Sequence, residues 1–256
     1  MDLNQFQDFL PLVTGFLGGA TSAGVFAGPI QTLQDWWYIN YGHNVSTQAA
    51  LLKATREASV EKLKNDILQE VATIPPENVQ EPSIKILGPA LEASRYYIEE
   101  EELRNIFSKI ISSSFDNRKN GMIHSSFVEV IKQLDVLDAQ ILQFLNESNY
   151  SKFAASPAMK MFLQDEQGIK TLFPLIFLTE ELFDFHRNAA AIINLERLGI
   201  ISIKDTQHLT DETEYYFIEK HPIIIHLLEH NPGFELGKLC FIITEFGQNF
   251  IDVCVV

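Results

Sequence analysis

The sequence predicts a mainly α-helical protein, in which a helical bundle is followed by an α+β, winged-helix-like C-terminal domain. In residues 46–148, apolar side chains recur at spacings of three and four, the pattern of helices that bury one face. In residues 149–256, a short helix ending before Gly199 precedes two apolar stretches of strand character, the order of helix and hairpin in a winged helix. Residues 1–45 are a third region, an apolar, glycine-rich segment with an aromatic cluster.

Five helices are predicted in the bundle: 46–74, one that starts after Pro82, one that opens at the glutamates of 99–102, one within 124–134, and 136–145. The first helix ends at Pro75 because proline lacks a backbone donor and clashes with the preceding turn. The predicted core is the set of apolar residues at helical spacing: Val60, Leu63, Ile67, Val71, Ile74, Ile84, Leu87, Leu91, Tyr96 or Tyr97, Leu103, Ile106, Phe107, Ile110, Ile111, Phe127, Val130, Ile131, Leu134, Leu137, Ile141 and Leu142.

The C-terminal region changes character along its length. Residues 156–185 are expected to form an irregular helix, interrupted by Pro157, Gly168 and Pro174. An amphipathic helix then covers 188–198, and Gly199 follows it at the position where a left-handed backbone is common. Strands are predicted at 200–203 and 239–243.

The N-terminal region carries no charged side chain from residue 9 to residue 34. Its length would suit a membrane span, which needs roughly 20 apolar residues, but many glycine, serine and threonine residues dilute it. Three interpretations stay open: packing onto the rest of the chain, contact with a membrane surface, and a true span. The candidate residues for contact with a membrane or a partner are Phe9, Leu10, Phe16, Leu17, Phe26, Trp36 and Trp37.

Charge and cysteine content restrict the expected partners and the cellular compartment of the protein. The 256 residues include 34 acidic and 19 basic side chains, a formal net charge of −15. Nucleic acid is therefore not an expected partner, because contact with phosphates requires a basic surface. The two cysteines, Cys240 and Cys254, lie among apolar residues, as in proteins of a reducing cytosol. We expect a cytoplasmic protein, with peripheral membrane attachment if the uncharged segment contacts a bilayer.

The sequence offers no cofactor or metal motif. The glycine-rich stretch 12–24 lacks the Gly-Lys-Ser/Thr ending of a phosphate-binding loop. His226 and His230 would share one face of a helix with Glu229 beside them, but the order is not His-Glu-x-x-His and no further ligand is indicated. We therefore predict neither a metal nor a cofactor.

One pair of residues fits a nucleolytic pattern. Arg118 and His124, in RKNGMIH, have the spacing of the Arg-x(4–6)-His element that HEPN ribonucleases use on the scissile phosphate. The element lies in a polar turn of a strongly acidic chain, and His124 is explained more simply as a residue before a helix that bonds to exposed backbone amides. Arg118 and His124 are thus weak catalytic candidates.

Several segments resemble one known family. They are GPIQTLQDWWYINYG (28–42), EASRYYIEEEELRNIFSKIISSSFD (92–116), HSSFVEVIKQLDVLDAQIL (124–142), INLERLGIISI (193–203) and ITEFGQNFIDVC (243–254). Together they resemble the abortive-infection alpha (Abi-alpha) family, except that Ser125 stands where its members tend to have proline. The resemblance implies a role in bacterial defence against phage, and it carries over no catalytic residue.

The leading hypothesis is therefore a non-enzymatic anti-phage protein that acts as an interaction or sensor module. A protein partner or a second copy of the chain is expected, and residues 9–34 would supply any membrane contact. Two alternatives stay open. One is a HEPN-like ribonuclease that uses Arg118 and His124. The other is an acidic winged-helix transcriptional regulator, although its predicted recognition helix offers only Arg187 and Arg197 as cations.

Overall fold

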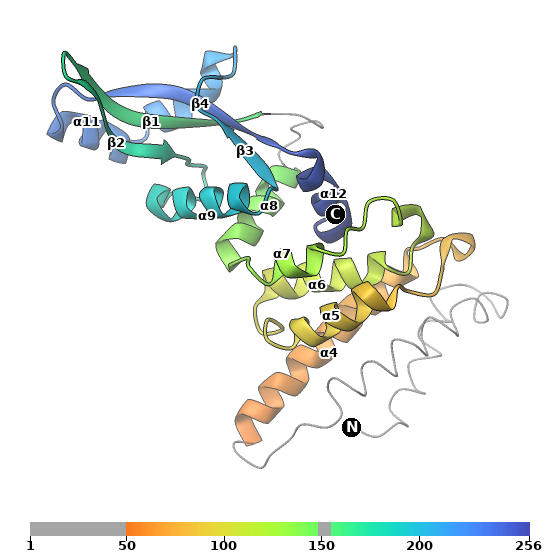
Figure 1. The fold of residues 1–256 in the computed structure, drawn as a ribbon. Helices are drawn as coiled ribbons and strands as arrows, with labels where there is room; N and C mark the ends of the chain where they lie inside the picture. The colour runs from red at the N-terminus through yellow and green to blue at the C-terminus, as the bar shows by residue number, and fades with distance from the viewer. Residues whose placement is uncertain (1–49, 148–154) are drawn as a thin grey trace. The chain divides into compact units, whose positions relative to one another are not determined.

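A computed structural model describes residues 50–147 and 155–256, which divide into two compact units (Figure 1). The first unit contains the described residues up to Val136 together with Asn249–Val256, and the second contains Leu137–Gln248. The N-terminal contact candidates, Phe9 to Trp37, lie outside the described residues. In the part of the chain that is described, no helix combines the length and apolar character needed to cross a membrane.

The first unit is helical, as the spacing of apolar residues predicts. Its helices are α4 (Ala50–Ala72), α5 (Ile84–Ser94), α6 (Glu101–Ser113), α7 (Phe127–Ile131) and the end of α12 (Glu245–Cys254), with short 3-10 helices η1 (Pro76–Asn78) and η2 (Asn117–Lys119). The predicted helices of this region are confirmed, and their apolar residues are buried. Two predictions are wrong: the Ile84 side chain is 63% exposed at the start of α5, and of the tyrosine pair Tyr96 is 73% exposed while Tyr97 is half-buried.

Two ion pairs connect α4 with α6. The Arg104 Nε atom lies 3.1 Å from a carboxylate oxygen of Asp66, and the Lys109 ammonium lies 2.9 Å from Glu70. Arg104 is largely buried and also donates to the carbonyl oxygen of Ile98, at 3.3 Å. A buried charge requires such partners, because desolvation without them costs several kcal/mol. These pairs therefore fix how the two helices align.

The second unit is built on a four-stranded antiparallel sheet with the order β2-β1-β4-β3. Its elements are α8 (Val136–Glu147), β1 (Ala155–Asp165), β2 (Gly168–Ile176), α9 (Phe185–Arg197), β3 (Ile201–Lys204), η3 (Glu212–Tyr215), α10 (Tyr216–Glu219), α11 (Pro222–His230) and β4 (Glu235–Ile243), from which α12 follows. Val136, the first residue of α8, belongs to the first unit.

The predicted fold class is wrong. The protein is α+β with a four-stranded sheet, and is not mainly α with a winged-helix domain. Residues 156–185 do not form an irregular helix: most of this stretch is the β1–β2 hairpin, closed by a turn in which the Asp165 carboxylate accepts the backbone N–H groups of Gln167 and Gly168. Gly168 has φ 134°, a conformation that side chains disfavour, so it belongs to the turn rather than to a helix.

The helix predicted at 188–198 and the two strands predicted after it are confirmed. α9 ends in a Schellman motif, since the N–H of Gly199 (φ 78°) donates to the Glu196 carbonyl and that of Ile200 to the Leu195 carbonyl. The strands predicted at 200–203 and 239–243 are β3 and β4, which pair with each other. β4 also pairs with β1 along its length, and this pairing makes a broad sheet in place of a two-stranded wing.

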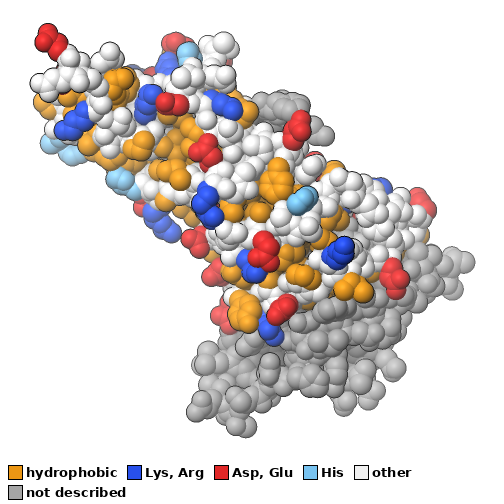
Figure 2. Space-filling model, viewed as in Figure 1, with side chains coloured by type: hydrophobic (Ala, Val, Ile, Leu, Met, Phe, Trp, Pro, Cys, Tyr) orange, Lys and Arg blue, Asp and Glu red, His pale blue; other side chains and the backbone are white. Residues whose placement is uncertain are grey.

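One hydrophobic cluster in the core of the second unit includes residues of β1 and β2. It contains Met159, Met161, Ile176, Leu178, Phe185, Tyr215, Ile218 and Ile224. Tyr215 is fully buried and its hydroxyl is satisfied on both sides, because it donates to the Leu239 carbonyl at 3.0 Å and accepts the Leu209 N–H at 2.9 Å. Other hydrophobic side chains reach the surface over the part of the molecule that carries the sheet (Figure 2).

The start of α12 is fixed by the residues T-x-x-G of 244–247. The Thr244 hydroxyl donates to the Gly199 carbonyl at 2.6 Å and accepts the Gly247 N–H at 2.9 Å, so it caps the helix. A side chain on Gly247 would overlap the carbonyl group of Ile200. Glycine is therefore required where α12 passes the backbone at the start of β3.

We predict that Gly247→Ala destabilises the protein by about 1–3 kcal/mol, the usual cost of forcing an extra carbon into a packed site. Denaturant unfolding followed by circular dichroism measures the change. Gly121→Ala is the matched control, because a β-carbon at that position meets nothing within 4 Å. Equal stability of the two variants would contradict the close approach.

Candidate functional site

The nucleolytic candidates Arg118 and His124 lie in the polar turn, residues 114–124, between α6 and α7. Arg118 is in η2, whose N-cap is Asp116. The Arg118 Nε lies 2.9 Å from one carboxylate oxygen of Asp116, its Nη2 lies 2.6 Å from the other, and its backbone N–H also donates to this carboxylate. The guanidinium is therefore engaged by an anion from its own turn.

The two partners of this ion pair differ in their exposure. The Asp116 side chain is almost fully buried while that of Arg118 is half exposed. The hydrogen bonds from Arg118 lower the pKa of the Asp116 carboxyl, and the same contact raises the pKa of Arg118. A phosphate group would have to compete with Asp116 for the guanidinium. This arrangement suits a structural ion pair better than a phosphate-binding arginine.

His124 belongs to a separate local arrangement. Its Nδ1 lies 2.7 Å from the Ser126 hydroxyl and accepts the Ser126 backbone N–H at 3.2 Å. Its ring centroid is 6.2 Å from that of Phe127, the first residue of α7. Ser126 is the N-cap residue of α7, so His124 satisfies a backbone amide at this helix start, as the simpler interpretation predicts.

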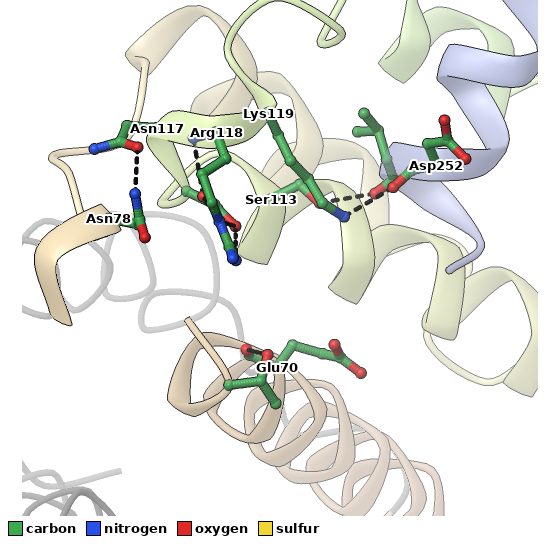
Figure 3. Close-up of polar contacts among 10 residues, drawn as sticks. Glu70, Asn78, Ser113, Asn117, Arg118, Lys119 and Asp252 are labelled. Atoms are coloured by element: carbon green, nitrogen blue, oxygen red, sulfur yellow. Dashed lines mark hydrogen bonds and ion pairs between the residues drawn. The ribbon is translucent and has the colours of Figure 1, made fainter. Parts of the chain in front are cut away.

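The polar turn is also attached to the segment after α4. Gln80 and Asn120 exchange two amide hydrogen bonds, of 2.6 and 2.9 Å, and Asn78 donates to Asn117 at 3.0 Å. The Gln80 backbone N–H donates to the Phe115 carbonyl at 2.8 Å. These contacts hold the turn through both its backbone and its side chains, and Figure 3 shows the hydrogen bond between Asn78 and Asn117. Sequence reasoning did not find them, because amide pairs separated by 40 residues leave no local pattern.

Lys119 and Ser113 bind the last turn of α12. The Lys119 ammonium donates to the Asp252 carbonyl and the Ser113 hydroxyl donates to the Val253 carbonyl, both at 2.8 Å (Figure 3). A cation at a helix C-terminus satisfies free carbonyl groups and the helix dipole. Burial lowers the pKa of Lys119 and raises that of the neighbouring Cys254 thiol well above its usual value, so the thiol is not activated.

Of the histidines at the start of and within α11, His226 and His230 lie close together and His221 does not join them. His226, Glu229 and His230 are exposed and offer ligand atoms that all lie within 4.8 Å of one another. The ring centroids of the two histidines are 4.0 Å apart. His221 is not in this group, because its Nδ1 accepts the Ile223 N–H as the N-cap of α11. The sequence-based expectation that His226, Glu229 and His230 share a face is confirmed.

Four large apolar side chains are exposed on the neighbouring helices α10 and α11. We call them the α10–α11 patch: Tyr216 (52% exposed), Phe217 (41%), Ile223 (40%) and Ile225 (42%). The Phe217 ring lies 5.9 Å from that of His221, at the junction of the two helices. The four side chains belong to two consecutive helices, and Ile223 and Ile225, two residues apart, point to different sides of α11. Exposed large apolar side chains are candidate contacts for a partner.

The fold and these contacts define an α+β protein with a helical unit and a sheet unit, and its nucleolytic candidates are occupied by structural contacts. A family model described as abortive infection alpha matches residues 55–254. The chain therefore belongs to the abortive infection alpha family, which confirms the resemblance found in the sequence. Comparison with curated proteins and with solved structures gave no match. Family membership indicates an anti-phage role, and it specifies no mechanism.

We predict that Asp116→Ala lowers the free energy of unfolding by about 1–3 kcal/mol at neutral pH, because the partly buried N–H groups of Arg118 lose an ionised acceptor. The lowered pKa of Asp116 means that this contribution is present above the usual carboxyl pKa and is lost as the pH falls through the lower folded value. The difference between the two proteins should therefore shrink below about pH 4.

Asp211→Ala is the matched control for this prediction. Asp211 also caps a 3-10 helix, but it is exposed, so its loss should cost less than that of Asp116. Urea unfolding at several pH values measures how much each of the two substitutions changes the free energy of unfolding. A stability difference for Asp116→Ala that grows on acidification would contradict the ion pair's role.

Proposed function

We propose that this protein acts in abortive infection as a non-enzymatic interaction module, and that it binds a protein partner through the α10–α11 patch. The observation that carries this proposal is the exposure of Tyr216, Phe217, Ile223 and Ile225 on two consecutive helices. Aromatic and branched apolar side chains are the usual anchors of protein interfaces. Burying each exposed portion against a partner would contribute about 1 kcal/mol.

The ion pair between Arg118 and Asp116 also favours a protein-binding role over a ribonuclease. A ribonuclease would need this guanidinium free for the scissile phosphate, whereas here it is held by two oxygens of Asp116. His124 is used at the start of α7. The net charge of −15 adds repulsion toward RNA. These observations support a protein partner rather than a nucleic-acid substrate.

We predict that the double variant Phe217→Ser/Ile225→Ser loses phage protection by at least about tenfold in plating efficiency, since interface anchors carry most of the binding energy. Its melting temperature should stay near that of the unaltered protein, because both side chains are already substantially exposed. The experiment is phage challenge of cells that express each variant at matched levels.

Three controls accompany this challenge. Ile84→Ser removes an exposed apolar side chain from the first unit and should keep full protection. Arg118→Ala and His124→Ala should also keep it. If either of these last two variants lost protection while remaining folded, and RNA fragmentation in infected cells disappeared with it, the ribonuclease interpretation would replace the present one.

The uncharged segment 9–34 supports a second part of the proposal, attachment at the periphery of a membrane. Its large apolar residues, followed by Trp36 and Trp37, have the composition of interfacial segments. Because the remainder of the chain is acidic, attachment to anionic lipid would have to rely on this apolar segment.

We predict that the full chain floats with neutral phosphatidylcholine vesicles and that a variant lacking residues 1–34 does not. Flotation through a density gradient measures the bound fraction. Circular dichroism of the shortened chain checks that its helices are retained. Absence of the full chain from the vesicle fraction, or equal flotation of both proteins, would refute membrane attachment by this segment.

A further inference from the structure

We propose that His226, Glu229 and His230 form a binding site for a divalent transition-metal ion, Zn²⁺ in the first place, on the exposed face of α11. The three side chains occupy positions i, i+3 and i+4 of one helix, which places them next to one another. Their ligand atoms lie within 4.8 Å of one another. Ligands at zinc distances are about 3.4 Å apart in a tetrahedron, so small rotations of these exposed side chains would bring them onto one ion.

A hydrogen bond already orients one of the ligands. The Nδ1 of His230 lies 2.9 Å from the backbone carbonyl oxygen of His226. A carbonyl oxygen only accepts, so Nδ1 carries the proton and Nε2 keeps the lone pair that can bind a metal. Metal-binding histidines are commonly held in this way, by donation from the other ring nitrogen to a carbonyl or carboxylate.

The electrostatic setting also favours a cation. His230 is the last residue of α11, and the negative end of a helix dipole attracts positive charge. Glu229 contributes a formal negative charge beside the two rings, and the whole chain is acidic. The Asn231 side-chain amide donates to the Leu227 carbonyl at 2.8 Å.

The donor set identifies the class of ion. Two imidazoles and one carboxylate suit Zn²⁺ and other late first-row ions, whereas Mg²⁺ and Ca²⁺ prefer oxygen donors alone. The order is His-x-x-Glu-His, which also occurs in zinc peptidases. Here all three side chains are solvent-exposed on a short surface helix, so the inference concerns binding only. A fourth position would remain for water or for a donor from another molecule.

The test uses the untagged full chain and ZnCl₂ alone, followed by isothermal titration calorimetry. The expected result is binding of one Zn²⁺ per chain, with a rise in melting temperature. His226→Ala and His230→Ala should each weaken binding by more than about 100-fold, since even indirect partners of a metal ligand are worth 10–100-fold. Glu229→Gln should weaken it by about tenfold.

His208→Ala is the matched control, because His208 is an exposed histidine of the same unit and lies outside the cluster. It should bind Zn²⁺ as the unaltered chain does. Alanine is a better helix former than histidine, so the two histidine variants should keep α11 folded, and circular dichroism checks this.

Three results would overturn the inference: no binding of Zn²⁺ by the full chain, equal binding by the His226 and His230 variants, or equally tight binding of Mg²⁺. None of these results depends on phage protection. The inference of a metal site can therefore be refuted without refuting the proposed interaction module, and the proposed module can be refuted without refuting the metal site.

Discussion

The antiparallel pairing of β1 with β4 is the constraint on which the second unit depends. Residues Ala155 to Phe162 pair with Ile242 to Glu235, so two segments about 80 residues apart in the chain form the middle of the sheet. β2 then adds to β1 through a tight hairpin, and β3 adds to the free side of β4. α9, α10 and α11 all lie in the connection between these central strands. The hydroxyl of Tyr215 reinforces the arrangement, because it binds the carbonyl of Leu239 in β4 from within that connection. The surface that carries the α10–α11 patch thus depends on a pairing made elsewhere.

The residues T-x-x-G-x-x-F at 244–250 show how one short segment serves both units. Thr244 caps α12 and binds the carbonyl of Gly199, while Gly247 lets the helix pass the backbone of Ile200. Phe250 belongs to the first unit, where its ring packs edge to face on Phe127 at 5.2 Å. Lys119 and Ser113 then bind the last carbonyls of the helix. The polar turn is accordingly explained as an attachment for α12, and the acidic and basic residues of that turn serve structure.

The sequence predicted the helices of the first unit because Leu63, Ile67, Phe107 and Ile110 follow helical spacing with little ambiguity. It failed for β1 and β2, where Pro157, Gly168 and Pro174 were interpreted as breaks in a helix. In the fold Gly168 makes the turn, and Pro174 lies on the edge strand, where a missing donor is tolerated. The main pairing partner of β1 is β4, and no local sequence pattern indicates a pairing between segments so far apart in the chain.

For the candidate site, the spacing of Arg118 and His124 indicates a catalytic pair, but spacing alone does not show that Asp116 binds the guanidinium. Spacing did succeed for His226, Glu229 and His230, because a helix converts i, i+3 and i+4 into proximity.

The discontinuous first unit has a consequence for synthesis. Its helices α4 to α7 leave the ribosome early, but Asn249–Val256, which complete it, are made only after the whole of Leu137–Gln248. At ordinary translation rates this interval lasts roughly 6–20 seconds. During that time Phe127 lacks the ring of Phe250, and Lys119 lacks the carbonyl of Asp252. A nascent chain therefore exposes an incomplete helical unit until the sheet unit has been produced.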